Sequence, residues 1–350
     1  MDLTTVADDL VVFHDGLHVS RFEGLEPDTV HMLAGVEVRT LPRPPGELLC
    51  RVATVNDLHF GEVEAGRIDE RTDGPIQRVG RDEDPYPETM NSAAVAEITA
   101  AAPAAVIVKG DVSTDGTDDE FAAFEASYRS EFGDRLHVVR GNHDAYRGQT
   151  RFAGDSWIDL PGVSIALLDT AVPGGATGFL TPAQLDWLDA RCATADRPVL
   201  VMGHHQQWIA GQRPVGTPAE QQRADPRDER RSDHYFGIHP DPSDGLDEVS
   251  ARRRSIVCYT AGHTHRHRVR RMTVSGIPSI EIGCVKDFPG TWAEYRVYEG
   301  GITQVVHRIS SPAALAWSEQ CRHLYADFGV DYEAYALGTL ADRCLDLPLR

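Results

Sequence analysis

Six short apolar segments, each ending in polar residues suited to metal or proton chemistry, constrain the fold of this chain most strongly. Segments with a helical pattern of apolar residues separate them. Continuous apolar runs of this length are typical of strands buried on both faces, as in α/β proteins. We therefore predict an α/β core that begins at residue 48. The segments are LLCRVATVND, AAVIVKGD, LHVVRGNHD, VSIALLDT, PVLVMGHH and SIVCYTAGH.

Two helices of this core have clear N-terminal signals. Thr117 and Glu120 have the spacing of a capping box and precede an apolar helical face. Thr181 and Gln184 have the same spacing, with Pro182 at the first helical position. We therefore predict helices that begin after Thr117 and after Thr181.

The chain divides into three expected parts. Residues 1–47 alternate in short apolar and polar segments and end in LPRPPGE, which predicts a small β-rich N-terminal extension. The core, residues 48–311, is expected to end in an antiparallel meander whose last two strands join at Gly300 and Gly301. Residues 312–350 are expected to form a C-terminal helical segment, packed on the core rather than serving as a binding site. The polar stretch 206–254 is either a functional loop or disordered.

Composition excludes several classes of protein. The 350 residues include 34 Lys and Arg against 54 Asp and Glu, a net charge of -20, which disfavours polymeric nucleic acid as a partner. No apolar stretch is long enough to span a membrane, and the start, MDLTTVADDL, lacks the features of a secretion signal. We therefore expect a cytoplasmic protein without a membrane partner. The six cysteines form no CxxC pair and are expected to be reduced core thiols.

Residues with metal-binding side chains follow five of the predicted strands. In α/β folds the carboxyl ends of strands carry the ligand site, so these residues could converge on one crevice. Oxygen and imidazole donors without a thiolate suit Zn, Mn or Fe. So many donors suit two metal ions about 3.5 to 4 Å apart, an arrangement that serves phosphoryl displacement. The residues are Asp57, His59, Asp111, Asn142, His143, Asp144, His204, His205, His263 and His265.

Five blocks in this order, DLH, GD, GNHD, GHH and GHTH, resemble the signature of the calcineurin-like metallophosphoesterases. The resemblance covers roughly residues 49–310 and is greatest to bacterial cyclic-nucleotide phosphodiesterases, whose fourth block is also a double His. It implies an α/β fold with a four-layer α-β-β-α sandwich as its core. It also implies two divalent or trivalent metal ions, Mn, Fe or Zn, at the strand ends. Structural histidines without a metal are the disfavoured alternative.

Carried over block by block, the resemblance implies seven metal ligands. They are Asp57, His59 and His265 for the first ion, Asn142, His204 and His263 for the second, and Asp111 between both. The choice of His204 over His205 rests on the GH pattern of the family. We further expect His143 to protonate the leaving oxygen, with Asp144 holding its ring in the useful tautomer.

These assignments predict a hydrolase in which a metal-bridging hydroxide attacks a phosphate ester. The favoured activity is that of a phosphodiesterase acting on a small diester, a cyclic nucleotide or a glycerophosphodiester. The alternatives are a phosphomonoesterase or nucleotide pyrophosphatase with the same metals, and a noncatalytic scaffold for protein interactions. Retention of His143 argues against the scaffold. A homodimer would be usual for related enzymes.

Other polar residues receive weaker predictions. Asp115 is expected to serve near a helix start rather than as a ligand. Arg266, His267 and Arg268 could meet substrate phosphate, although a charge run more often faces solvent. The candidates for substrate selection in the polar stretch are Arg213, Arg223, His234 and His239.

Overall fold

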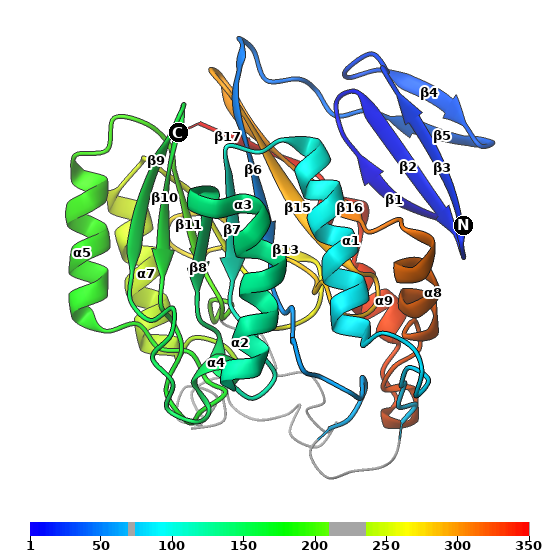
Figure 1. Ribbon diagram of the computed structural model, residues 1–350. Helices are drawn as coiled ribbons and strands as arrows, with labels where there is room; N and C mark the ends of the chain where they lie inside the picture. The colour runs from blue at the N-terminus through cyan, green and yellow to red at the C-terminus, as the bar shows by residue number, and fades with distance from the viewer. Residues whose placement is uncertain (69–73, 210–235, 350) are drawn as a thin grey trace.

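The computed structural model describes residues 1–68, 74–209 and 236–349 (Figure 1). Two six-stranded sheets form its centre. In the first sheet β6, β7 and β8 are parallel, and β15, β16 and β17 extend the sheet antiparallel. The sheet order is β17 (Leu345–Pro348), β16 (Gly301–Arg308), β15 (Thr291–Tyr298), β6 (Leu48–Val55), β7 (Ala105–Lys109), β8 (Leu136–Val139).

In the second sheet β10, β11, β12 and β14 run parallel, and an antiparallel strand closes each edge. The sheet order is β13 (Arg268–Arg271), β14 (Pro278–Glu281), β12 (Ile256–Ala261), β11 (Val199–Gly203), β10 (Val163–Leu168), β9 (Ser156–Leu160). The strands that precede the expected ligands are thus β6, β7 and β8 of one sheet and β11 and β12 of the other.

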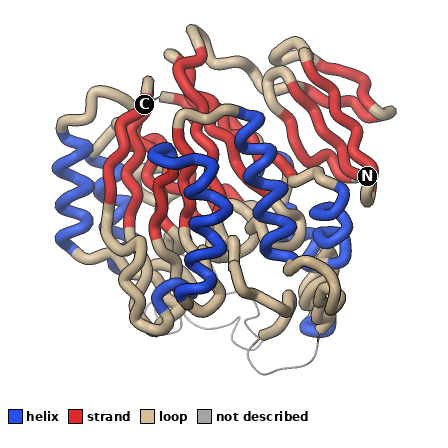
Figure 2. Tube along the Cα trace, viewed as in Figure 1, coloured by secondary structure: helices blue, strands red, loops and turns tan. Residues whose placement is uncertain are grey.

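Helices cover the outer face of each sheet (Figure 2). Helix α2 continues through one π-helical segment, η1, into α3. The helices of the core are α1 (Tyr86–Ala101), α2 (Asp118–Phe124), η1 (Glu125–Arg129), α3 (Ser130–Phe132), η2 (Gly133–Arg135), α4 (Asn142–Ala145), α5 (Pro182–Ala193) and α7 (Pro240–Arg252). Those of the C-terminal segment are α8 (Pro312–Gln320), η4 (Ala326–Phe328), α9 (Tyr332–Leu337) and α10 (Leu340–Arg343).

Three apolar clusters separate the layers. Between the sheets, side chains such as Ile107 and Leu200 pack face to face. Outside the second sheet, Leu188 of α5 and Leu246 of α7 belong to one cluster with strand residues. Outside the first sheet, Met90 of α1 belongs to the third. This alternation of helices, sheet, sheet and helices confirms the expected α/β fold with a four-layer core.

Both helix starts predicted from capping boxes are confirmed. The Thr117 side chain accepts a hydrogen bond from the Glu120 amide, and the Glu120 carboxylate accepts one from the Thr117 amide at 2.9 Å. Thr181 and Gln184 make the same reciprocal pair, and Pro182 opens α5. Local side-chain chemistry thus fixes where these helices begin.

One expectation about the chain after residue 268 is wrong, and another is incomplete. The expected antiparallel meander is instead two hairpins in different sheets, because β14 pairs in parallel with β12 while β15 pairs with β6. The last hairpin, β15 to β16, turns at residues 299–300 and pairs Tyr298 with Gly301. The C-terminal segment is helical as expected, but it ends in β17, which pairs with β16. Strand pairings of this kind depend on partners far away in the sequence.

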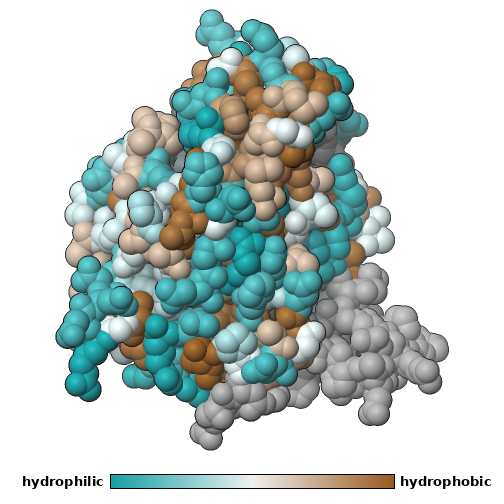
Figure 3. Space-filling view, turned by 90° about the vertical axis from the view of Figure 1, so that its right-hand side faces the viewer, coloured by the Kyte–Doolittle hydropathy of each residue, from teal (hydrophilic) through white to brown (hydrophobic). Residues whose placement is uncertain are grey.

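The N-terminal residues form strands that pack beside the first sheet. Thr5 donates a hydrogen bond from Oγ1 to the carbonyl of Val306 at 2.7 Å. Large apolar side chains remain exposed here, among them Leu17, Val30 and Met32, and Figure 3 shows apolar side chains gathered on the upper part of this face. The strands are β1 (Asp2–Val6), β2 (Leu10–Asp15) and β3 (His18–Glu23) in one sheet, with β4 (Val30–Leu33) and β5 (Val36–Arg39) in another.

The structure bears on two predictions from composition. All six cysteines are buried and free, as expected for reduced core thiols. Within the described ranges, no helix combines the length and the apolar character that crossing a bilayer requires.

Candidate metal centre

The expected ligands of the first ion meet where β6, β7 and β12 end. His265 Nε2 lies 3.5 Å from Asp57 Oδ1. His59 Nε2 lies 3.7 Å from Asp111 Oδ2. Asp57, His59 and His265 each offer one donor atom within 4.8 Å of the others. Residues up to 208 positions apart in the chain are therefore brought to one point.

The expected ligands of the second ion meet on the other side of Asp111. His204 Nε2 lies 3.0 Å from Asn142 Oδ1 and 3.2 Å from Asp111 Oδ2. Its Nδ1 lies 2.8 Å from the carbonyl oxygen of Lys109. Because a carbonyl can only accept, Nδ1 donates to it. Burial opposes a positive charge on the ring, but the Asp111 carboxylate outweighs it and raises the pKa of His204 to about 9, so Nε2 also carries a proton and would offer its lone pair when an ion takes the place of that proton. The side chain of Asp111 is therefore shared by both groups.

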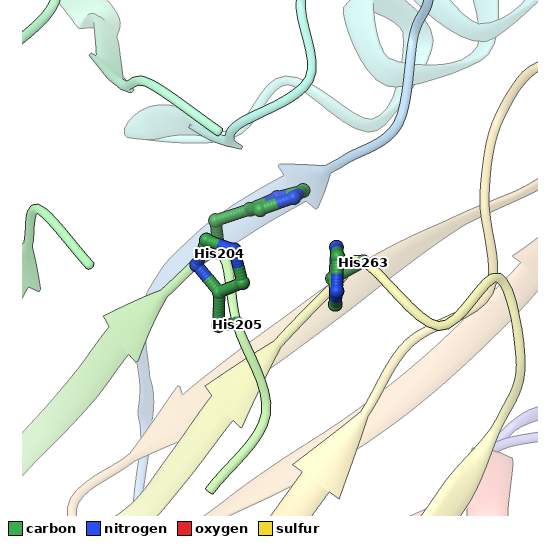
Figure 4. A group of neighbouring side chains, drawn as sticks. All are labelled: His204, His205 and His263. Atoms are coloured by element: carbon green, nitrogen blue, oxygen red, sulfur yellow. The ribbon is translucent and has the colours of Figure 1, made fainter. Parts of the chain in front are cut away.

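His204 and His205 differ in their surroundings. Figure 4 shows that the two rings leave the chain after β11 in different directions and that His263 approaches from β12. The Nδ1 atom of His205 forms a hydrogen bond with Thr170 Oγ1 at 2.8 Å. His205 also belongs to a possible donor group with His204 and His263, and its buried Nε2 has no hydrogen-bond partner among the described residues. The contact with both Asp111 and Asn142, however, is made by His204. The geometry therefore favours His204 as the ligand.

Strained backbone concentrates at these residues. Of the ten non-glycine residues with positive φ in the described part of the chain, five are expected ligands. They are Asp57, His59, Asp111, His263 and His265, with φ between 48° and 68°. Such a conformation costs about 1–3 kcal/mol per residue, so it persists where the surrounding structure demands it, as at functional sites.

Two glycines of the motifs are needed for close approach. A Cβ atom on Gly110, whose φ is +83°, would lie 2.6 Å from His204 Nδ1. A Cβ atom on Gly262 would lie 2.8 Å from Asp57 Oδ2. Both distances are too short for any side chain, so the glycines let the strand ends of the two sheets approach each other.

Buried ring nitrogens without partners indicate what the site holds. Both ring nitrogens of His59 and Nε2 of His263 are buried and have no hydrogen-bond partner among the described residues. Leaving such a group unpaired costs about 1–3 kcal/mol. Burial first, and then the positive charges of neighbouring groups, lower the pKa of His59 and of His263 well below the usual range. Neutral imidazole is the form that binds metal ions, so these residues fit a metal.

The surroundings of Asp111 and Asp57 favour the ionised form of both carboxylates. Burial opposes ionisation of Asp111, but the neighbouring His204 and His143 outweigh it and hold the pKa of Asp111 well below its usual range. Burial likewise opposes ionisation of Asp57, and His265 outweighs it and lowers the pKa of Asp57. Two carboxylates among imidazoles and one amide oxygen form a donor set that fits divalent ions such as Zn, Mn or Fe.

His143 lies beside the centre, but Asp144 does not hold its ring. His143 Nδ1 lies 2.7 Å from the carbonyl oxygen of Thr114, so this nitrogen donates and Nε2 is the ring nitrogen left for other contacts. Asp144 accepts instead from the amides of Gly141 and Ser113, at 2.8 and 2.9 Å. It therefore ties the loop after β8 to the loop after β7, and a backbone carbonyl that no residue type signals orients the ring.

The basic run after the last block forms an internal ion network. Glu281 accepts from Nε of Arg266 at 2.9 Å and from Arg268 at 2.8 Å. The buried His267 lies 3.2 Å from Thr291 Oγ1 and accepts from the amide of Gly283. The two expected roles were contact with substrate phosphate and exposure to solvent. These contacts fit neither, because Arg266 and Arg268 pair with Glu281 of β14.

Of the remaining candidates, two lie in the described ranges and three do not. Asp115 is exposed and pairs with Arg147 at 2.8 Å, as expected for a residue that binds no metal. His239 precedes α7, and its ring lies 6.4 Å from that of Phe179. Arg213, Arg223 and His234 fall in residues 210–235, outside the described ranges.

Sequence reasoning missed the charged groups behind the first-ion ligands. Lys286 Nζ lies 2.6 Å from Glu62 Oε1, and Glu62 Oε2 lies 3.8 Å from His59 Nδ1. Asp287 Oδ2 lies 3.8 Å from His265 Nδ1. One signal was available, because Lys286 and Lys109 are the only lysines in the sequence. Lys109 is also buried near the centre, where its Nζ donates to the carbonyl of Ala261 at 3.0 Å.

Comparison with known proteins supports the reading of the motifs. A probable cyclic nucleotide phosphodiesterase from Synechococcus sp. is 30% identical over 115 residues, which is 31% of this chain and 45% of the relative. The 3',5'-cyclic adenosine monophosphate phosphodiesterase CpdA from Pseudomonas aeruginosa is 26% identical over 191 residues, 53% of this chain and 63% of the relative. The chain therefore spans less than two thirds of either protein.

A solved structure shares the fold. The crystal structure of a dimetal phosphatase from Danio rerio superposes with a TM-score of 0.56 and 16% identity, covering 87% of this chain and 100% of that one. The family model described as calcineurin-like phosphoesterase matches residues 50–267, which contain all seven expected ligands. The resemblance read from the five blocks is thereby confirmed, and the chain belongs to the calcineurin-like phosphoesterase family.

Proposed function

We propose that this protein is a metal-dependent phosphodiesterase that hydrolyses a small phosphate diester, with cyclic nucleotides ahead of glycerophosphodiesters. One observation carries the proposal: Asp111 Oδ2 lies 3.7 Å from His59 Nε2 on one side and 3.2 Å from His204 Nε2 on the other. A carboxylate between two groups of oxygen and imidazole donors is the arrangement that two metal ions share. The names of both bacterial relatives refer to cyclic nucleotides, which supports the choice of substrate.

The donor set supports two ions, chosen from Mn, Fe and Zn. Asp57, His59 and His265 would hold one, Asn142, His204 and His263 the other, and Asp111 both. Bound there, such ions would stabilise negative charge on the phosphate oxygens and lower the pKa of a water molecule. We propose that residues 48–311 carry this centre, with residues 1–47 and 312–350 as flanking parts.

The remaining steps belong to side chains around the centre. Asp111 Oδ1 accepts a hydrogen bond from the His143 amide at 2.9 Å, so the shared carboxylate and the proton donor are fixed to each other. His143 presents Nε2 while the Thr114 carbonyl holds Nδ1. In its protonated form the ring can give the Nε2 proton to the leaving oxygen, which avoids release of a free alkoxide.

The test is a paired assay of Mn-loaded protein on bis(p-nitrophenyl) phosphate and on p-nitrophenyl phosphate. We expect faster cleavage of the diester, and loss of that cleavage in Asp111→Asn purified in parallel. A screen of 3',5'-cyclic nucleotides and glycerophosphodiesters then follows with the same pair of proteins. Faster cleavage of the monoester would contradict the proposal in favour of a phosphomonoesterase. An inactive protein with two metals bound would indicate a scaffold.

A further inference from the structure

Three side chains of the C-terminal segment, residues 312–350, reach the first-ion side of the centre. The hydroxyl of Tyr332 donates to Asp287 Oδ1 at 2.7 Å. The hydroxyl of Tyr335 donates to the carbonyl of Thr264 at 2.7 Å, and the indole of Trp317 donates to the carbonyl of Lys286 at 2.9 Å. All three lie beyond residue 267, where the family match ends.

Asp287 occupies the position behind His265. It is fully buried, and its Oδ1 accepts from Tyr332 and, at 3.0 Å, from the thiol of Cys284. Its Oδ2 has no hydrogen-bond partner in the described part of the chain and lies 3.8 Å from His265 Nδ1. Two donors thus hold one oxygen, and the other oxygen is left for the imidazole.

This arrangement has a known physical effect on a metal ligand. A metal-binding His commonly donates its second ring N–H to a carboxylate, which fixes the ring and makes the metal-binding nitrogen more basic. Here Nδ1 of His265 faces Asp287, while Nε2 faces Asp57 at 3.5 Å. Asp287 therefore stands where it can orient Nε2 of His265 toward the first ion.

The charged groups behind the ligands also favour a bound cation. Glu62 and Asp287 carry two negative charges, and Lys286, 2.6 Å from Glu62 and 3.9 Å from Asp287, carries one positive charge. The group is therefore net negative, which favours a cation held by the histidines in front of it. The Trp317 hydrogen bond fixes the backbone that carries Lys286 and Asp287.

Tyr335 supports the turn that carries His263 and His265, through a backbone carbonyl of that turn. Thr264 lies between His263 and His265, both of which have positive φ, 68° and 53°. Its carbonyl would be free to turn without Tyr335, whose hydroxyl binds it. A hydrogen bond at this peptide group opposes relaxation of the strained turn that presents both histidines.

We infer that the C-terminal segment is part of the metal centre, with Tyr332 and Tyr335 as positioning residues for the ligand His265. Tyr332 acts through Asp287, and Tyr335 acts through the Thr264 carbonyl. The inference rests on the proposed metal centre but concerns residues that lie outside the family match.

The test compares Tyr332→Phe and Asp287→Asn with a matched control, Tyr295→Phe. Tyr295 is also a buried tyrosine with a hydrogen-bonded hydroxyl, to Thr260 Oγ1 at 3.2 Å, but neither residue is an expected ligand. Mn²⁺ affinity is measured by titration calorimetry on the metal-stripped full chain, and stability by urea denaturation of the same sample. Removing such supporting groups lowers metal affinity about 10- to 100-fold.

We expect Asp287→Asn and Tyr332→Phe to weaken the binding of one of the two ions by about 10-fold or more. Tyr335→Phe should weaken that binding less, and Tyr295→Phe should leave the binding of both ions unchanged. With Co²⁺ in the site, the visible absorption should change in Tyr332→Phe and stay as in the unmodified protein in Tyr295→Phe. If Asp287→Asn fails to fold, the two tyrosine variants carry the test.

Two outcomes separate this inference from the proposed function. If the unmodified protein binds two ions and the Asp287 and tyrosine variants bind both as tightly, the inference is wrong and the proposed centre stands. If the unmodified protein binds fewer than two ions, the dinuclear centre itself is wrong, and the inference falls with it.

Discussion

The two halves of the proposed metal centre differ in which parts of the chain support them. On the second-ion side, the Lys109 carbonyl fixes His204 at 2.8 Å and the Tyr146 hydroxyl accepts from Asn142 Nδ2 at 2.7 Å. Both supports lie within residues 50–267. On the first-ion side, the group behind His265 consists of Asp287 and the C-terminal Tyr332.

This difference teaches that a family match can contain every expected ligand and still omit part of their support. A hydrogen bond to the backbone at a strand end, such as that to the Lys109 carbonyl, is a consequence of the fold itself. Support from a side chain such as Asp287 depends on what a particular chain places behind the ligand. The two halves should therefore respond separately to substitution, and the following predictions test that separation.

The largest effect is expected on the second-ion side, from His204→Ala. Removing the ring that faces both Asp111 and Asn142 should lose one ion and lower diester hydrolysis at least about 10³-fold, since each tenfold is 1.36 kcal/mol and a metal contributes several kcal/mol. Metal content by mass spectrometry and initial rates measure this. His205→Ala is the matched variant and should keep both ions. The reverse result would assign the ligand to His205.

His143→Ala should come next and should affect neither half of the metal site. Loss of a general acid lowers the rate about 10²–10⁴-fold, and both ions should remain. The loss should be smaller on bis(p-nitrophenyl) phosphate than on a diester with an alkoxide leaving group, because nitrophenolate leaves without a proton. Equal losses on the two substrates would argue against the assigned role.

Tyr146→Phe should give a moderate effect confined to the second ion. It removes the hydroxyl bound to Asn142, so one Mn²⁺ should bind up to about 10-fold more weakly. In the double variant with Tyr332→Phe, the two losses should add, because they act on different ions. Calorimetry of the three proteins measures this, and strong non-additivity would contradict independent halves.

The N-terminal extension provides a baseline remote from both ions. Burial, and then the charge of Arg308, lower the pKa of His14 from 6.5 to about 4; its ring bonds Thr4 at 2.8 Å and Ser310 at 3.1 Å. As the pH falls, His14 therefore takes up a proton at a higher pH in the unfolded chain than in the folded protein. The stabilising contribution is full above pH 6.5 and is lost as pH falls toward 4, up to about 3 kcal/mol.

Urea denaturation at a series of pH values from 7 to 4 measures this effect, with His14→Gln as the control. The variant should show a shallower loss of stability in that range and unchanged metal binding. Identical pH profiles for the two proteins would show that His14 titrates normally.

The sequence was most informative where residue type alone carries the chemistry. Apolar runs followed by Asp, Asn or His predicted both the sheets and the meeting of Asp57, Asp111 and His204. Capping residues predicted helix starts because those hydrogen bonds are local. The features that the sequence did not predict depend on contacts between distant parts of the chain. The carbonyl of Thr114 carries no residue signal, and the route of the chain from β14 to β15 between sheets cannot be read from alternation.

The most direct test of the centre is anomalous X-ray diffraction from crystals of the Mn-loaded protein. We predict two anomalous peaks, with Asp111 in contact with both. The first should be bound by Asp57, His59 and His265, and the second by Asn142, His204 and His263. A single peak, or two peaks with Asp111 bound to only one, would contradict the dinuclear centre.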